Sequence, residues 1–172
     1  MATAVEDLWP ADIESPPDQL APITILKQQA AMLGLRTRNL LEAVVQTEDE
    51  DPPAAPFGDT TVRLPLGDQP VRLRHTLFLV APALNFYRYR LLEASHAAVS
   101  LYPVTIRAGW ERHLPTGVEQ MAGTPHTRSA SNEAEFKEVL RDIFAHEETK
   151  RIIGSLLAQS GEQHSQILDP SF

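Results

Sequence analysis

Apolar side chains recur at every third or fourth position in the segment that begins at Pro22 and ends near Gln46. This spacing gathers them on one side of an α-helix, because a helix turns once every 3.6 residues. Pro22 suits the first turn of such a helix. We therefore predict one long helix over residues 22–46, with a main stripe formed by Ile23, Leu26, Ala30, Leu33, Thr37, Leu40 and Val44.

A second apolar set widens the apolar surface of this helix beyond a single stripe. This set comprises Ile25, Met32, Leu35, Leu41 and Val45. One interpretation is that the whole helix packs across the protein's own sheet. The other is that a second chain covers one side of it, as in a homo-oligomer. The repeat is long enough for a coiled-coil seam of about three heptads. The predicted oligomer seam consists of Ile23, Leu26, Leu33, Leu40 and Val44.

The pattern changes to strand-like alternation in residues 60–107. The segments TTVRLPL, VRLRHTLFLV, NFYRYRLL and AAVSLYPVTIR are rich in β-branched and aromatic residues, and turn-like breaks separate them. The spacing predicts an antiparallel meander of three or four strands. Pro65 and Pro103 restrict the first and fourth segments to edge or bulged strands.

The rest of the chain predicts helices and connecting segments. Residues 114–130 read as a long polar loop, and a helical pattern follows with a break at AHEETKR and an end at Gly161. Residues 1–21 read as an acidic, Pro-rich tail, residues 47–59 as an acidic linker, and residues 161–172 as a C-terminal tail.

Together these elements predict an α+β fold. A small antiparallel β-meander of three or four strands is packed by the long N-terminal helix and the C-terminal helical pair. Residues 60–160 form the α+β core, and residues 22–160 are expected to form one domain.

Composition narrows the class of protein. The 172 residues include no cysteine, which excludes disulfides and thiolate metal sites, and 42% are hydrophobic, enough for a sizeable core. No apolar run approaches the 18 or so residues of a membrane span, and the acidic N-terminus lacks the features of a secretory signal. We expect a bacterial-type cytoplasmic protein with no membrane partner.

Charge is distributed in three blocks. Residues 1–59 carry 3 basic and 11 acidic side chains, residues 60–115 carry 7 and 3, and residues 116–172 carry 5 and 9. A basic middle between two acidic ends indicates an electrostatic partner for the middle block, and that partner can be the protein's own acidic segments.

The arginines of the basic middle suggest a binding surface. Alternation puts Arg72 and Arg74 on one face of their strand and Arg88 and Arg90 on one face of the next, with Tyr87 and Tyr89 on the opposite face. Four arginines on one sheet face would repel each other unless phosphate, an acidic partner or the protein's own acids covered them. A nucleic-acid-binding module that uses these four arginines is therefore one alternative function.

Catalytic signatures are scarce. The phosphate-binding glycine loops GxGxxG and GxxxxGK, the serine elbow GxSxG and the HExxH metal motif do not occur in the sequence. His113, beside Glu111, and His126 are the candidate acid–base groups of a second alternative, a small enzyme with a site near the 114–130 loop. We predict no metal and no cofactor.

The sequence therefore favours a non-catalytic interaction protein, acting as a homo-oligomer or as a subunit of a larger protein assembly. The surplus apolar surface of the long helix and the lack of catalytic motifs carry this prediction.

Overall fold

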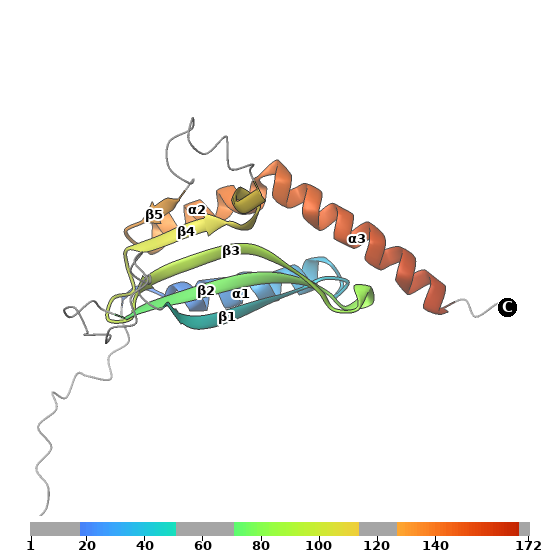
Figure 1. Cartoon of the computed structure of the whole chain (residues 1–172), viewed down its shortest axis with the longest axis horizontal. Coiled ribbons are helices and arrows are strands. Elements are labelled where there is room, and N and C mark those ends of the chain that lie inside the picture. The colour runs from blue at the N-terminus through green and yellow to red at the C-terminus, as the bar shows by residue number, and fades with distance from the viewer. Residues whose placement is uncertain (1–17, 51–70, 114–126, 169–172) are drawn as a thin grey trace, which may run out of the picture.

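The computed structural model describes residues 18–50, 71–113 and 127–168, and within them it contains one antiparallel sheet of five strands in the order β1-β2-β3-β4-β5 (Figure 1). The strands are β1 (Glu42–Glu50), β2 (Arg72–Ala81), β3 (Tyr87–Ala97), β4 (Val104–Ala108) and β5 (Arg128–Ala130). Each strand pairs with the next along the chain, so the sheet is a meander. The predicted α+β class is confirmed, although five strands replace the expected three or four.

Two helices cover one face of this sheet, and these are α1 (Pro22–Arg36) and α2 (Glu133–Ala145) (Figure 1). A third helix, α3 (Glu147–Leu168), follows α2 directly, and short 3-10 turns occur at η1 (Pro82–Leu84) and η2 (Gly109–His113). The core between helices and sheet is built from fully buried side chains, among them Ile25, Leu26, Leu79, Leu92, Ile106, Phe136 and Ile143.

The prediction of one helix over residues 22–46 was wrong, because α1 ends at Arg36. Arg38 and Asn39 take left-handed backbone angles (φ 53° and 61°), and the Asn39 N–H donates to the Gly34 carbonyl oxygen at 2.8 Å. Such a left-handed residue after the last turn is a common helix end, and asparagine tolerates it well. The chain then reverses and enters β1.

Residues 42–50 form a strand because β1 can pair with β2 along its whole length, from Glu42 opposite Val80 to Glu50 opposite Arg72. Val44, Val45 and Thr47 are β-branched, which suits a strand. The predicted linker 47–59 is therefore wrong for residues 47–50, while residues 51–59 and the predicted strand TTVRLPL lie outside the described residues.

The predicted oligomer seam does not exist as one surface. Ile23, Leu26 and Leu33 lie on α1, but Leu26 is fully buried in the protein's own core. Leu40 lies in the turn after α1, and Val44 lies on β1. The argument for a homo-oligomer through a long helix therefore has no structural basis, although the oligomeric state itself stays a prediction.

Other boundaries also differ from the sequence prediction. The predicted loop 114–130 is wrong for residues 128–130, which form β5 by pairing with β4. Residues 93–97 were expected to be a turn but belong to β3, and Gly161 does not end α3, which continues to Leu168. A glycine inside a helix costs only about 1 kcal/mol, so neighbouring turns can carry the helix past it. The predicted break near His146 is confirmed, since α2 ends at Ala145 and α3 begins at Glu147.

The start of α2 provides a test of local stability. The Asn132 side chain accepts a hydrogen bond from the Glu135 N–H at 3.0 Å, and the Glu135 carboxylate accepts one from the Ser131 N–H at 2.7 Å. This is a reciprocal cap that satisfies two backbone donors. Asn132→Ala is expected to lower the free energy of unfolding by about 1 kcal/mol in urea denaturation. Glu138→Ala, an exposed change on the same helix, should alter it by less than about 0.5 kcal/mol.

Candidate functional site

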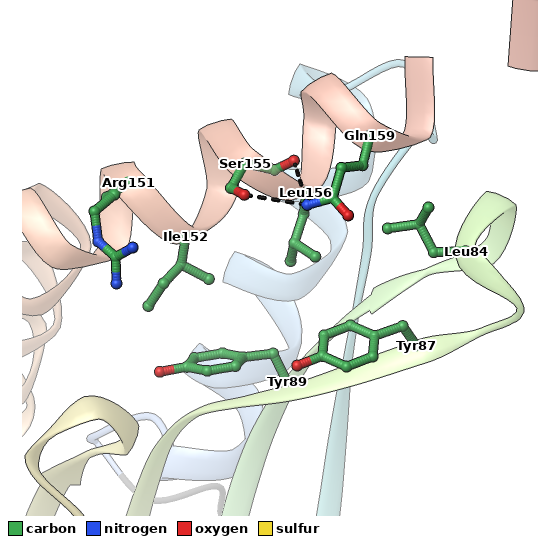
Figure 2. Close-up of a pocket in the computed structure, with 8 residues that line it drawn as sticks. All are labelled: Leu84, Tyr87, Tyr89, Arg151, Ile152, Ser155, Leu156 and Gln159. Atoms are coloured by element: carbon green, nitrogen blue, oxygen red, sulfur yellow. Dashed lines mark hydrogen bonds between the residues drawn. The ribbon is translucent and has the colours of Figure 1, made fainter. Parts of the chain in front are cut away.

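A groove lies where α3 leaves the helix layer and passes over the end of the β2–β3 hairpin (Figures 1 and 2). Its volume is about 400 Å³. Its walls come from η1, from the first residues of β3 and from α3, and the lining residues are Leu84, Tyr87, Tyr89, Arg151, Ile152, Ser155, Leu156 and Gln159. The groove therefore brings the end of the β2–β3 hairpin together with α3, which is distant in the sequence.

The groove has an apolar end and a polar end. Figure 2 shows Ile152 and Leu156 projecting from α3 toward the rings of Tyr87 and Tyr89, with Leu84 at the hairpin end. Both tyrosine hydroxyls point away from Leu84, toward the end where Arg151 lies. A ligand along this groove would meet mainly apolar carbon at the Leu84 end, where the Gln159 amide is the polar group, and hydrogen-bond donors at the other end.

The polar end is rich in donors. Burial raises the pKa of Tyr89, and the nearby Glu148 carboxylate raises it further, so the phenol stays protonated and can donate. Arg151 forms two hydrogen bonds to Glu148, one of them from Nε at 2.9 Å, and 70% of the Arg151 side chain is exposed. The remaining guanidinium donors can serve a second acceptor, because an arginine carries five N–H groups.

A β-bulge in β3 lets two consecutive leucines enter the core, whereas Tyr87 and Tyr89 stay on the face of Leu91. Leu77 pairs with Leu92 but Phe78 pairs with Arg90, so Leu91 is an extra residue in β3. Strict alternation put Leu92 on the face of the arginines, but the bulge turns both Leu91 and Leu92 into the core, where they are 2% and 0% exposed. Tyr87 lies before the bulge and is 51% exposed, so its ring is available at the groove.

The four predicted arginines share the sheet face opposite the helices, but they form two separate pairs. Arg72 and Arg74 lie opposite Ala97 and Ser95 of β3, whereas Arg88 and Arg90 lie opposite Val80 and Phe78 of β2. The two pairs therefore lie toward opposite ends of the hairpin and make no single cluster.

The chain's own groups engage all four arginines. Glu50 of β1 bonds to Arg72 at 3.3 Å and to Arg74 at 2.6 Å, and Glu93 bonds to Arg90 at 2.7 Å. Although burial raises the pKa of Glu50, its hydrogen bonds to these arginines bring that pKa below the usual value. The remaining guanidinium, that of Arg88, lies 4.7 Å from the centre of the Phe78 ring. This arrangement gives no specific support to a nucleic-acid surface.

A second cluster, which the sequence did not reveal, is the buried pair His75 and His96. Their Nε2 atoms lie 3.0 Å apart, and the residues are 2% and 4% exposed. His96 Nδ1 lies 2.7 Å from the Ser100 carbonyl oxygen, and His75 Nδ1 lies 2.9 Å from the Thr47 hydroxyl oxygen. Strand pairing could have suggested the pair, since Leu73, two residues before His75, lies opposite His96. However, His96 lies in the turn-like break that the sequence predicts between NFYRYRLL and AAVSLYPVTIR.

The predicted acid–base groups lie mostly outside the part of the chain that the structure describes. The His113 side chain and all of His126 lie outside the described residues, so the enzyme hypothesis near the 114–130 loop has no geometry to support it. Within the described ranges, no three histidine or carboxylate side chains gather in a way that would hold a metal ion.

Comparison with known proteins does not identify a family. No protein-family model, no curated protein and no solved structure matches this chain. Among residues 18–50, 71–113 and 127–168, no helix combines the length and the apolar character that a membrane crossing requires.

Proposed function

We propose that this protein is a non-catalytic interaction module that binds an apolar segment of another protein in the groove between α3 and β3. The composition of the groove carries the proposal. Tyrosine and arginine are, with tryptophan, enriched at the energetic centres of protein interfaces. Here Tyr87, Tyr89 and Arg151 line one groove together with Leu84 and Ile152. Aromatic rings supply a large contact area at low entropic cost.

Charge indicates which kind of segment suits this groove. Arg151 is the charged residue of the groove lining, whereas Arg88 and Arg90 lie on the opposite face of the sheet. The chain as a whole carries a net charge of −8. An acidic partner would be repelled by most of the protein and attracted at this end, which favours encounter in the correct orientation. The proposed ligand is therefore an apolar segment that carries a carboxylate.

A second copy of the chain is a poorer occupant. In a two-fold symmetric dimer through this groove, the same surface of both copies would meet. Arg151 of one copy would then lie in the same interface as Arg151 of the other, which is unfavourable. This argument favours a subunit of a mixed assembly over the homo-oligomer.

Light scattering at low and at high salt separates these two forms of the proposal. We expect the mass of a monomer at both salt concentrations. A stable dimer that disappears in Ser155→Trp would instead assign the groove to a second copy, because Ser155 is exposed and its replacement by a large side chain would fill the groove.

Selection from a random pool of displayed 12-residue peptides tests the proposed ligand directly. On the wild-type protein we expect enrichment of peptides that combine large apolar residues with Asp or Glu, and Ser155→Trp should abolish it. Ala31→Trp makes a comparable change at an exposed position of α1 and should leave the enrichment intact. Equal enrichment on wild type and Ser155→Trp would contradict the proposal.

Arginine and lysine on the same helix allow a matched test of the acidic requirement. Arg151 lines the groove and pairs with Glu148, whereas Lys150 pairs with Glu147 and lies outside the lining. Arg151→Ala should weaken binding of the enriched peptides about tenfold or more, since a hydrogen bond to a charged group contributes about 1.5–3 kcal/mol. Lys150→Ala should leave their affinity within about twofold, by isothermal titration calorimetry, as expected when only a screened surface charge is lost.

A further inference from the structure

The tip of the β2–β3 hairpin has an unusual backbone. Asn85 and Phe86 both have φ of 56°, in the left-handed region. Asparagine visits this region routinely, but a bulky aromatic residue there is an outlier. Glycine is the usual residue at such a position, because it has no side chain to clash with the backbone. The chain therefore keeps a large side chain where the backbone disfavours one.

The Phe86 side chain gains little from the fold in return. It is 68% exposed, and it does not belong to the core or to the partly buried side chains packed against the core. Its backbone N–H forms only a long hydrogen bond, 3.4 Å to the Pro82 carbonyl oxygen. Neither packing nor turn geometry accounts for phenylalanine at this position.

Position along the hairpin connects Phe86 to the groove. Its neighbour Tyr87 and the nearby Leu84 both line the apolar end, as Figure 2 shows. The groove follows α3 from Arg151 to Gln159, a distance of about 12 Å at 1.5 Å per residue. An extended segment of about four residues fills that length, so a longer segment with its carboxylate near Arg151 continues past Leu84 to the tip.

We propose that Phe86 is an anchor residue, held in a left-handed conformation to present its ring to the apolar part of an acidic partner segment that lies in the groove. The inference rests on the function proposed above and adds the direction of the bound segment. Its acidic end lies at Arg151, and its apolar end lies at the hairpin tip. Strain kept at an exposed aromatic residue is typical of a site maintained for binding at the expense of stability.

The replacement Phe86→Gly tests this inference, because folding and binding should respond in opposite directions. Glycine relieves the backbone strain, so the midpoint of thermal unfolding should rise by about 2–4 °C. Loss of the ring should reduce the affinity for peptides enriched on the wild-type protein at least tenfold. Asn85→Gly is the matched control, since it changes the adjacent left-handed residue and keeps the ring. It should bind like the wild type.

Each outcome of the peptide selection decides between the two proposals. Peptides that bind the wild type and Phe86→Gly equally, but not Ser155→Trp, would overturn the role of Phe86 and leave the groove function standing. No enrichment on the wild type would overturn both. A fall of several degrees in the unfolding midpoint of Phe86→Gly would also overturn the inference, because it would give the ring a structural role.

Discussion

Replacing Gly109 with alanine is expected to lower the free energy of unfolding by about 3 kcal/mol, at the upper end of the usual cost of overpacking. A Cβ atom at Gly109 would lie 1.9 Å from the Arg90 carbonyl oxygen and 3.1 Å from that of Leu91. Both are backbone atoms in the bulged part of β3, so no flexible side chain can move aside. The backbone angle φ of Gly109 is not in the left-handed region, so the cost is steric.

Gly154→Ala provides the opposite control for this prediction. A Cβ atom at Gly154 would meet nothing within 4 Å, and the residue lies inside α3. Alanine should therefore stabilise the protein by about 0.5–1 kcal/mol through helix propensity alone. Urea denaturation of the two variants checks both the expected loss and the expected gain in free energy of unfolding. A Gly109→Ala protein as stable as the wild type would mean that the start of η2 can move away from the bulge at little cost.

The same bulge marks a limit of what the sequence could predict. Periodicity identified β2 and α2, because the apolar positions of each element follow one repeat without interruption. It also identified the break after α2, where that repeat stops. In β3 the extra residue Leu91 changes the face of every later side chain. A two-residue repeat cannot reveal such a shift, since it depends on how the neighbouring strands pair.

The predicted end of the N-terminal helix was wrong for a different reason. Around Leu40 and Val44 a helical repeat and a strand repeat fit the same apolar residues. Two features make this segment a strand: its pairing with β2 and the left-handed turn at Asn39. The first depends on contacts distant in sequence, and the second depends on backbone geometry. The groove was missed likewise, because Tyr89 and Ile152 come together only through the placement of α3 (Figure 2).

The second large effect on stability is expected from a change in pH. Its origin is the buried pair His75 and His96. A carbonyl oxygen can only accept, so His96 Nδ1 carries a hydrogen and donates to Ser100. His96 Nε2 then accepts from the His75 Nε2–H, and His75 Nδ1 accepts from the Thr47 hydroxyl. Every ring nitrogen is satisfied while both rings are neutral.

Protonation disturbs this arrangement. Burial and, to a smaller extent, the nearby charges of His96 and Lys27 together lower the pKa of His75 to about 4. The unfolded chain has the ordinary histidine pKa of about 6.5, so it binds more protons than the folded chain between pH 6.5 and 4. The stabilisation is therefore complete above about pH 6.5 and is lost progressively as the pH falls toward 4, by an amount on the order of 3 kcal/mol.

Urea denaturation at pH 7 and pH 4 should therefore show a large loss of stability, and His75→Gln isolates the contribution of His75. The glutamine amide can both donate and accept but does not titrate, so the variant should lose only what the other titratable groups lose over the same range. Glu50, for example, has a lowered pKa and also becomes less stabilising in acid. Between pH 7 and pH 4, the loss in free energy of unfolding should be about 2–3 kcal/mol larger for the wild type than for the variant.

An NMR titration of the His75 ring in the wild-type protein gives an independent reading that does not depend on how well the variant folds. We expect a midpoint near 4, because the ring is enclosed between α1 and the first two strands and cannot gain a proton without losing its bond from Thr47. A midpoint near 6.5 would mean that water reaches the ring. The pair would then be a solvated surface feature, and stability should be nearly constant from pH 7 down to the range where the carboxylates titrate.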